Sequence, residues 1–110
     1  MTAHTGQATF DALAEALLTS RPEVTRSTMM GLPCLRVKGA FFAACDRRTD
    51  HLLVKLPEHR VVALVAAGEA EPFAPAGRRF RQWAAIPLPL VAGWPALLGD
   101  ALDFVDGGGR

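Results

Sequence analysis

The chain has 110 residues, of which 50% are hydrophobic and 21% are charged, and its formal net charge is +1. This composition excludes a disordered chain, whose hydrophobicity would be lower and whose net charge would be larger, and the length suits one domain with one core. Its apolar stretches are shorter than the roughly 20 residues that span a bilayer, and the N-terminus lacks a signal-peptide pattern. We therefore expect a cytoplasmic protein with no membrane partner.

Three segments have the apolar spacing of amphipathic helices. The first is predicted over residues 8–19, where apolar side chains recur at intervals of three and four. The second should begin at Pro57 and end at Gly68, and the third should begin at Pro95 and end at the glycines of residues 107–109. Proline suits a first helical position because its φ is already helical and no N–H donor is needed there, whereas glycine favours a helix end.

Between the first two helices the apolar period is two, which indicates strands. Four segments separated by glycine, proline or polar turns predict an antiparallel meander: residues 24–30, 34–39, 41–46 and 51–56. A further strand is predicted over Arg79–Ile86. Residues 71–77, EPFAPAG, contain too much proline to pair and should form a loop.

The connections between these strands are too short for the crossovers of a parallel sheet. We therefore predict one α+β domain over residues 1–110, with two layers, an antiparallel sheet of about four or five strands, and the helices on one face. Residues 1–6 and 107–110 are expected to be flexible ends.

Gly39 and Ala40 are predicted to form a two-residue turn between the second and third strands, with glycine first. The pairs across this hairpin would then be Lys38 with Phe41, Arg36 with Ala43, and Cys34 with Cys45. One side of the sheet would be apolar if a five-residue loop followed the third strand: Leu35, Val37, Phe42, Ala44, Leu52, Val54 and Leu56. The other side would gather cations around one aromatic ring: Arg36, Lys38, Phe41, Leu53 and Lys55.

Residues 77–83, GRRFRQW, place three arginines close to a tryptophan. In an alternating strand Arg79 and Arg81 would share a side with Trp83, and Phe80 would face the other way. Arginine binds phosphate through paired hydrogen bonds, and an aromatic ring beside it can stack on a base. The same segment is also compatible with a solvated strand whose tryptophan lies at the core edge, covered by arginine stems.

Cations concentrate in the middle of the chain, because residues 26–83 hold ten basic and five acidic side chains while both ends are acidic. Such a region attracts an anionic partner. Cations on exposed strands also discourage aggregation through sheet edges, so a purely solvated face is the alternative. The predicted nucleic-acid contacts are the cations of the exposed sheet side and of residues 77–83, with the tryptophan: Arg36, Lys38, Lys55, Arg78, Arg79, Arg81 and Trp83.

The sequence has no pattern typical of catalysis or metal binding. It contains neither a GxSxG nucleophile motif nor a Walker phosphate loop. Cys34 and Cys45 have only His51 nearby as a third zinc ligand, and without an export signal we expect free thiols. We therefore predict no enzymatic activity, no metal and no cofactor.

The segment GLPCLRVKGAFFA, followed by LLVKLP and then by EPFAPAGRRFRQWAAIP, resembles the YjbR/MmcQ family of small bacterial proteins, related to the TfoX N-terminal domain. The resemblance covers roughly residues 7–106, and Ala40 stands where many members have lysine. It implies a two-layer α+β fold with an antiparallel sheet, and DNA binding in which hairpins act as a double wing. The positions that carry it are Gly39, Phe41, Phe42, Lys55, Pro57, Pro72, Gly77, Arg78 and Trp83, of which Lys55, Arg78 and Trp83 are most strongly implied as DNA contacts.

The leading hypothesis is a non-enzymatic nucleic-acid-binding protein, with DNA as the partner, that uses the exposed sheet side and residues 77–83. One alternative is a protein-interaction module or homodimer that uses an apolar patch around Phe41, Leu53 and Trp83. A second alternative is a small-anion pocket around Lys55 and Arg78.

Overall fold

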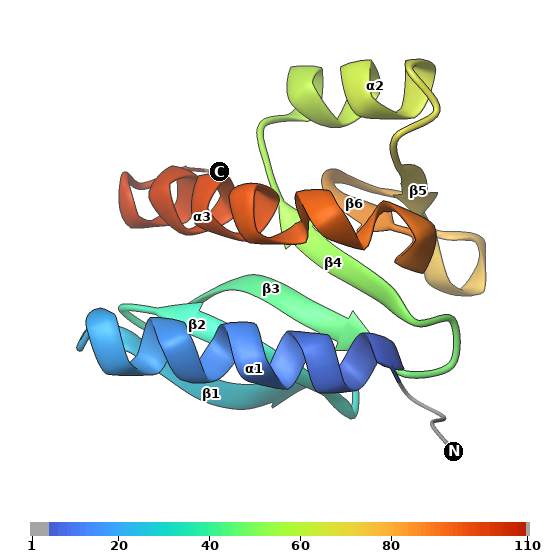
Figure 1. Cartoon of the computed structure of the whole chain (residues 1–110). Helices are drawn as coiled ribbons and strands as arrows, with labels where there is room; N and C mark the ends of the chain where they lie inside the picture. The colour runs from blue at the N-terminus through green and yellow to red at the C-terminus, as the bar shows by residue number, and fades with distance from the viewer. Residues whose placement is uncertain (1–4, 110) are drawn as a thin grey trace.

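The computed structural model describes residues 5–109, which form an α+β structure with three helices and one six-stranded sheet (Figure 1). The elements follow in chain order: α1 (Thr5–Ser20), β1 (Val24–Met29), β2 (Leu32–Val37), β3 (Ala40–Asp46), β4 (His51–Lys55), α2 (Glu58–Ala66), β5 (Glu71–Phe73), the 3-10 turn η1 (Pro75–Gly77), β6 (Phe80–Ile86), the 3-10 segment η2 (Leu88–Gly93) and α3 (Trp94–Asp106). Every strand pair is antiparallel, and the strand order is β1-β2-β3-β4-β6-β5. The α+β class is therefore confirmed, with more strands than predicted.

The helices begin and end close to the predicted positions. Helix α1 starts at Thr5, earlier than predicted, and thereby includes part of the expected flexible end, of which residues 1–4 lie outside the described part, as does residue 110. Helix α2 follows Pro57 and ends as expected at a glycine. Gly68 has a φ of 75° and its N–H donates to the carbonyl of Val65, while Glu69 N–H donates to Leu64, so the last carbonyls of α2 are satisfied.

The hairpin of β2 and β3 has a different register from the predicted one. The turn residues are Lys38 and Gly39, both with positive φ (52° and 83°), rather than Gly39 and Ala40. Both central residues of this mirror-image turn need positive φ, and Lys38 adopts it despite its side chain. The observed pairs are Val37 with Ala40, Arg36 with Phe41, Leu35 with Ala43, and Cys34 with Ala44.

Phe42 is the extra residue of a bulge in β3, because the pairs change from Phe41 to Ala43 between Arg36 and Leu35. The bulge reverses the faces of the residues that follow it, so that Ala44 lies on the side opposite to the predicted one. Asp46 pairs with His51, which makes the following loop one residue shorter than predicted. The predictions for Leu35, Val37, Phe42, Leu52, Val54 and Leu56 are nevertheless confirmed, since all of them lie in the helix-side core.

Residues 71–77 were expected to form a loop, and this prediction is wrong for the first part. Glu71–Phe73 pair with β6 and form the sixth strand, at the edge of the sheet. Pro72 is tolerated there because an edge strand needs hydrogen bonds on one side only. The remainder of the segment forms the turn η1.

The main core lies between the sheet and the helices. Helix α1 packs on β1, β3 and β4, α3 packs on β2, β3 and β4, and α2 packs on β5 and β6 (Figure 1). Each helix contributes buried apolar side chains: Phe10 and Ala14 from α1, Val61 from α2, and Trp94, Leu98, Ala101, Leu102 and Val105 from α3. The stretch Leu88–Asp106 is apolar enough to cross a membrane by length and composition alone, a test that core helices such as α3 also pass.

A second, smaller apolar cluster lies on the other side of the sheet and includes no helical residue. Its buried members are Cys34, Ala44, Leu53, Phe73 and Ala85. Partly buried side chains surround them: Met29, Leu32, Phe41, Phe80 and Trp83. We call this side of the sheet the uncovered face.

Candidate nucleic-acid interface

Arg36 and Phe41 form a cation and ring pair on the uncovered face. They lie opposite one another in β2 and β3, beside the turn. The guanidinium carbon of Arg36 is 4.3 Å from the centre of the Phe41 ring, a distance at which the ring quadrupole attracts a cation. The Nε of Arg36 is buried and has no hydrogen-bond partner in the described chain. Arg36 as a whole is partly exposed and makes no ion pair with a described carboxylate, so its charge can attract an anionic ligand.

Lys55 and Trp83 lie opposite one another in β4 and β6, which places a second cation next to a second ring. Both are partly buried, and Lys55 makes no ion pair with a described residue. Ala43 pairs with Val54, two residues after Phe41 and one before Lys55, so the two pairs lie near one another on neighbouring strands. Four neighbouring strands thus carry a row in which cations and rings alternate: Arg36, Phe41, Lys55 and Trp83.

The ring of Phe73, on β5, connects Trp83 with Phe80. Its centre lies 5.7 Å from that of Phe80 and 6.5 Å from that of Trp83. The prediction that Phe80 and Trp83 face opposite ways is therefore wrong. The pairing of β5 with β6 is irregular between Pro72 and Phe73, which leaves residues 81–83 unpaired on that side and lets both rings contact Phe73.

Arg78 and Arg79 lie exposed just before β6. The guanidinium carbon of Arg78 is 5.5 Å from the centre of the Phe80 ring, so Arg78 borders the same aromatic cluster. Arg79 makes no ion pair with a described carboxylate. Of the six predicted cations, four are thus free of carboxylate partners within the described chain: Arg36, Lys55, Arg78 and Arg79.

The other two predicted cations do not join this group. Lys38 lies in the turn and its Nζ is 2.9 Å from Asp106, at the end of α3, so it is bound to the helix layer. Arg81 lies 3.7 Å from Glu58, at the start of α2. The expectation for Lys38 depended on the predicted turn, which the structure moves by one residue, whereas Arg81 lines a hollow together with Lys55 and Trp83, as the shared side predicted.

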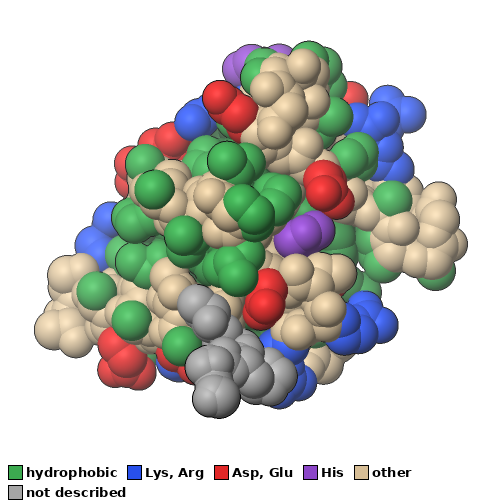
Figure 2. Space-filling view, turned by 45° about the vertical axis from the view of Figure 1, so that its right-hand side comes forward, with side chains coloured by type: hydrophobic (Ala, Val, Ile, Leu, Met, Phe, Trp, Pro, Cys, Tyr) green, Lys and Arg blue, Asp and Glu red, His purple; other side chains and the backbone are tan. Residues whose placement is uncertain are grey.

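Cations on the helix side are held in ion pairs. Arg26 contacts Asp11 at 2.9 Å, and Arg60 contacts Asp100 at 2.8 Å. In Figure 2, which views the helix side obliquely, lysine and arginine side chains lie at the outline, and hydrophobic and acidic side chains occupy the middle. The uncovered face and its rim therefore offer an anion more unpaired positive charge than the helix side does.

Arg21 and Glu23 illustrate this pairing on the helix side. A hydrogen bond to Glu23 raises the pKa of Arg21. A backbone hydrogen bond and the Arg21 side chain lower the pKa of Glu23. Arg21 also lies 3.4 Å from Asp106. These charges connect the helix layer with the sheet rather than face a ligand.

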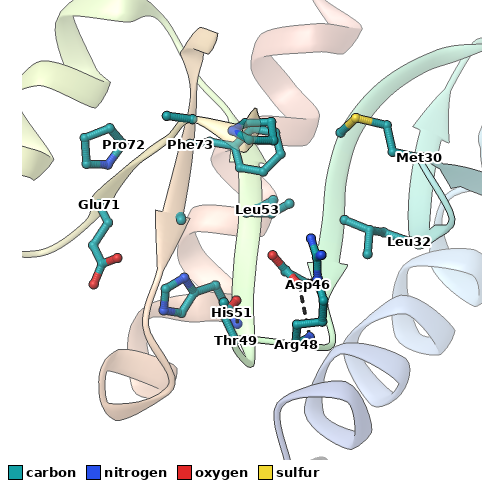
Figure 3. A pocket seen from close by; sticks show the side chains of 13 residues that line it. Met30, Leu32, Asp46, Arg48, Thr49, His51, Leu53, Glu71, Pro72 and Phe73 are labelled. Carbon is teal, nitrogen blue, oxygen red and sulfur yellow. Dashed lines mark hydrogen bonds and ion pairs between the residues drawn. The ribbon is translucent and has the colours of Figure 1, made fainter. Parts of the chain in front are cut away.

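Two hollows adjoin the rings of the uncovered face. One, of about 340 Å³, is lined by Lys55, Phe80, Arg81, Gln82 and Trp83; Arg78, expected beside Lys55 in an anion pocket, is not among them. The other, of about 280 Å³, lies near the β3–β4 turn (Figure 3). Sequence reasoning missed this second cavity because one of its walls, Phe73, belongs to the segment that was predicted to be a loop.

Cys34 and Cys45 are buried free thiols on opposite sides of the sheet, so their predicted pairing is wrong and the prediction of free thiols is confirmed. Burial raises the pKa of Cys34, and it raises the pKa of Cys45 to about 12.

Within residues 5–109 no three metal-ligating side chains gather at one point. A comparison of the chain with protein-family models, with curated proteins and with solved structures gives no match.

Proposed function

We propose that this protein binds nucleic acid, with single-stranded DNA as the favoured form, through the uncovered face and without catalysing a reaction. The observation that carries the proposal is the row of alternating cations and rings on four neighbouring strands: Arg36, Phe41, Lys55 and Trp83. The resemblance to the YjbR/MmcQ family supports a DNA partner. Membership of that family is itself a proposal.

The rings and the cations of the row match different parts of a nucleotide. Base rings stack on aromatic side chains, and such stacking contributes about 1–3 kcal/mol per base. Lysine and arginine bind the phosphates, and here Arg36 and Lys55 flank the rings instead of pairing with carboxylates. Arg78 and Arg79 extend the positive charge beyond Phe80.

A single strand suits this arrangement better than a duplex. The bases of a duplex are stacked on one another and do not present their flat sides to a protein surface, whereas an unpaired strand can place them on exposed rings. The positions of Phe41 and Trp83 within strands keep the rings in fixed places on the sheet. The double-wing mode that the family resemblance implies instead predicts duplex binding through hairpins.

The test is a fluorescence anisotropy titration of labelled single strands and duplexes of the same sequence at several salt concentrations. With about four phosphate contacts, the logarithm of the affinity for the single strand should fall with the logarithm of salt concentration at a slope near −3. Tighter binding of the duplex would favour the double-wing mode. Absence of salt-sensitive binding to either form at low ionic strength would remove the proposal.

Homodimer formation through the same face is the second candidate, and one observation favours it. Met30 is 62% exposed and lines the cavity near the β3–β4 turn together with Leu32, which extends the apolar surface away from the cations. Association through apolar surface should be insensitive to salt and visible by analytical ultracentrifugation of the protein alone. A monomer at all concentrations would exclude it.

A small anion is the remaining alternative. The hollow beside Lys55 and Trp83 contains two cations, Lys55 and Arg81, of which Arg81 is partly neutralised by Glu58. A thermal-shift screen with phosphorylated metabolites tests this alternative, because a ligand that binds the folded state raises its melting temperature.

A further inference from the structure

The cavity of about 280 Å³ lies on the uncovered face, at the other end of β4 from Lys55 (Figure 3). Leu53 lines the cavity, and it is two residues from Lys55, which is about 7 Å along a strand. Phe73 lines it as well, and this ring also belongs to the cluster of Trp83. The cavity therefore lies beside the row of cations and rings, with Phe73 between them.

The cavity has an apolar part and a polar part. Leu53, Phe73 and Ala85 are buried side chains of the apolar part. Asp46 and His51, which pair across β3 and β4, belong to the polar part, where Figure 3 shows them close to Arg48. Such a division fits a small planar group that has one polar edge.

Asp46 is the buried acceptor of the polar part. Asp46 is only 9% exposed, and its Oδ1 accepts a hydrogen bond from the backbone N–H of Arg48 at 3.0 Å. The Nε of Arg48 lies 3.7 Å from the same oxygen. Both contacts use Oδ1 rather than Oδ2, and Asp46 lines the cavity. The cavity thus presents a carboxylate oxygen that can accept a hydrogen bond from a ligand.

The charges around the cavity argue against a phosphate inside it. Asp46 and Glu71 both line the cavity, and Arg48 is the cation among the lining residues. The volume is slightly below the range of about 300–1,000 Å³ that drug-sized ligands occupy, so one heteroaromatic ring system is a suitable occupant. The Arg48 side chain is 83% exposed and can reach a phosphate outside the cavity.

We propose that this cavity receives one amino-bearing base, cytosine, adenine or guanine, of the strand bound on the uncovered face, with its exocyclic amino group donating to Oδ2 of Asp46. The inference rests on the proposed function. Carboxylates accept from the amino group of cytosine, whereas thymine presents a carbonyl oxygen at the corresponding place. Two oxygens would then face one another; thymine still has its N3–H donor, but the carbonyl oxygens on both sides of it repel the carboxylate, so thymine is disfavoured.

The first experiment measures the affinities of oligodeoxycytidylate and oligodeoxythymidylate of about ten nucleotides by fluorescence anisotropy. The wild-type protein should bind the cytidine strand about tenfold more tightly, the effect expected of one hydrogen bond to a charged acceptor. In Asp46→Asn the side chain retains an oxygen for the Arg48 N–H, but the other position becomes an amide donor, which should abolish or invert the preference. Asp100→Asn changes the charge equally, at the ion pair with Arg60 on the helix side, and should keep the preference.

The second experiment adds deoxycytidine or deoxythymidine monophosphate and follows the backbone amide signals by NMR. Deoxycytidine monophosphate should shift the amides of residues 46–53, Glu71, Phe73 and Ala74 more than the thymidine nucleotide does. Equal salt-sensitive binding of both strands would overturn the base site while leaving the proposed function standing. If neither strand binds but the cytidine nucleotide shifts these amides, the base site stands and the proposed function fails; if neither occurs, both fail.

Discussion

The Nζ of Lys38 lies 2.9 Å from a carboxylate oxygen of Asp106, which joins the β2–β3 turn to the end of α3. Asp106 also contacts Arg21, at 3.4 Å, in the segment between α1 and β1. One carboxylate therefore connects three parts of the chain. This arrangement removes Lys38 from the predicted group of ligand-binding cations and gives it a structural role instead.

Replacing Asp106 should lower the stability of the fold without weakening DNA binding. Asp106→Asn should lower the melting temperature by a few degrees, because it leaves Lys38 and Arg21 without their shared partner at the end of α3. The affinity for single-stranded DNA should stay the same or rise slightly, since a negative charge is lost and Lys38 is released. Circular dichroism melting and anisotropy measure the two effects. Loss of DNA affinity in a folded variant would contradict this division of roles.

Neutralising two unpaired cations should weaken binding and its salt dependence together. Lys55→Gln with Arg79→Gln removes two proposed phosphate contacts, and the slope of log affinity against log salt should become shallower by about 1.4 on a single strand. The control pair is Arg26→Gln with Arg60→Gln, which changes the net charge equally but affects cations held by Asp11 and Asp100. Equal effects of the two pairs would mean that only net charge matters.

Truncating a ring of the row should reduce affinity without changing the salt slope. Phe41→Ala removes a stacking surface, and binding of a single strand should weaken about tenfold or more. Leu90→Ala is the control, because Leu90 is 37% exposed on the helix side and its loss also removes surface apolar area. An affinity unchanged by Phe41→Ala, in a variant that unfolds at a similar temperature, would remove the ring from the interface.

The two thiols should stay protonated in the folded protein at neutral pH, and Cys45 should make the folded state less stable as the pH becomes alkaline. Burial is the first cause of the raised pKa of Cys45, about 12, followed by the charge of Asp50. A cysteine of the unfolded chain ionises near pH ~8.5, so the folded state holds more protons above that pH and loses stability between about 8.5 and 12. Cys45→Ala should reduce this loss, measured as the denaturation midpoint against pH.

Alkylation provides an independent check on the thiols. Iodoacetamide at neutral pH should leave both cysteines unmodified in the folded protein and modify both in denaturant, as read by mass spectrometry. Rapid modification of Cys45 under native conditions would contradict its burial.

Much of the fold could be predicted because local rules decided it. Pro57 and Gly68 mark the ends of α2, and the period-two pattern assigns Leu52 and Val54 to the helix side. Leu52 and Val54 were assigned to the correct side from an incorrect register. The bulge at Phe42 and the shorter loop before His51 each reverse the side that later residues face, so the two errors cancel. A bulge leaves no mark in the alternation that precedes it, so the register could not be derived from the sequence.

Local rules also predicted part of the candidate interface, and the undetected changes of register account for the rest. Arg36 and Phe41 share a face in both registers, and Lys55 and Trp83 were identified correctly as neighbours of that face. Lys38 was misplaced because the choice between two possible turns depended on whether a lysine accepts positive φ. The cavity at Asp46 could not be found, because it requires the pairing of β5 with β6, which the prolines around Phe73 argued against.

The indole N–H signals of the two tryptophans provide the most direct test of the interface. Trp83 is partly buried on the uncovered face, whereas Trp94 is 0% exposed in the helix-side core. On adding a short single-stranded DNA to the ¹⁵N-labelled protein, we expect the Trp83 signal, assigned with Trp83→Phe, to shift progressively while the Trp94 signal stays in place. An unmoved Trp83 signal at saturating DNA would contradict binding on the uncovered face.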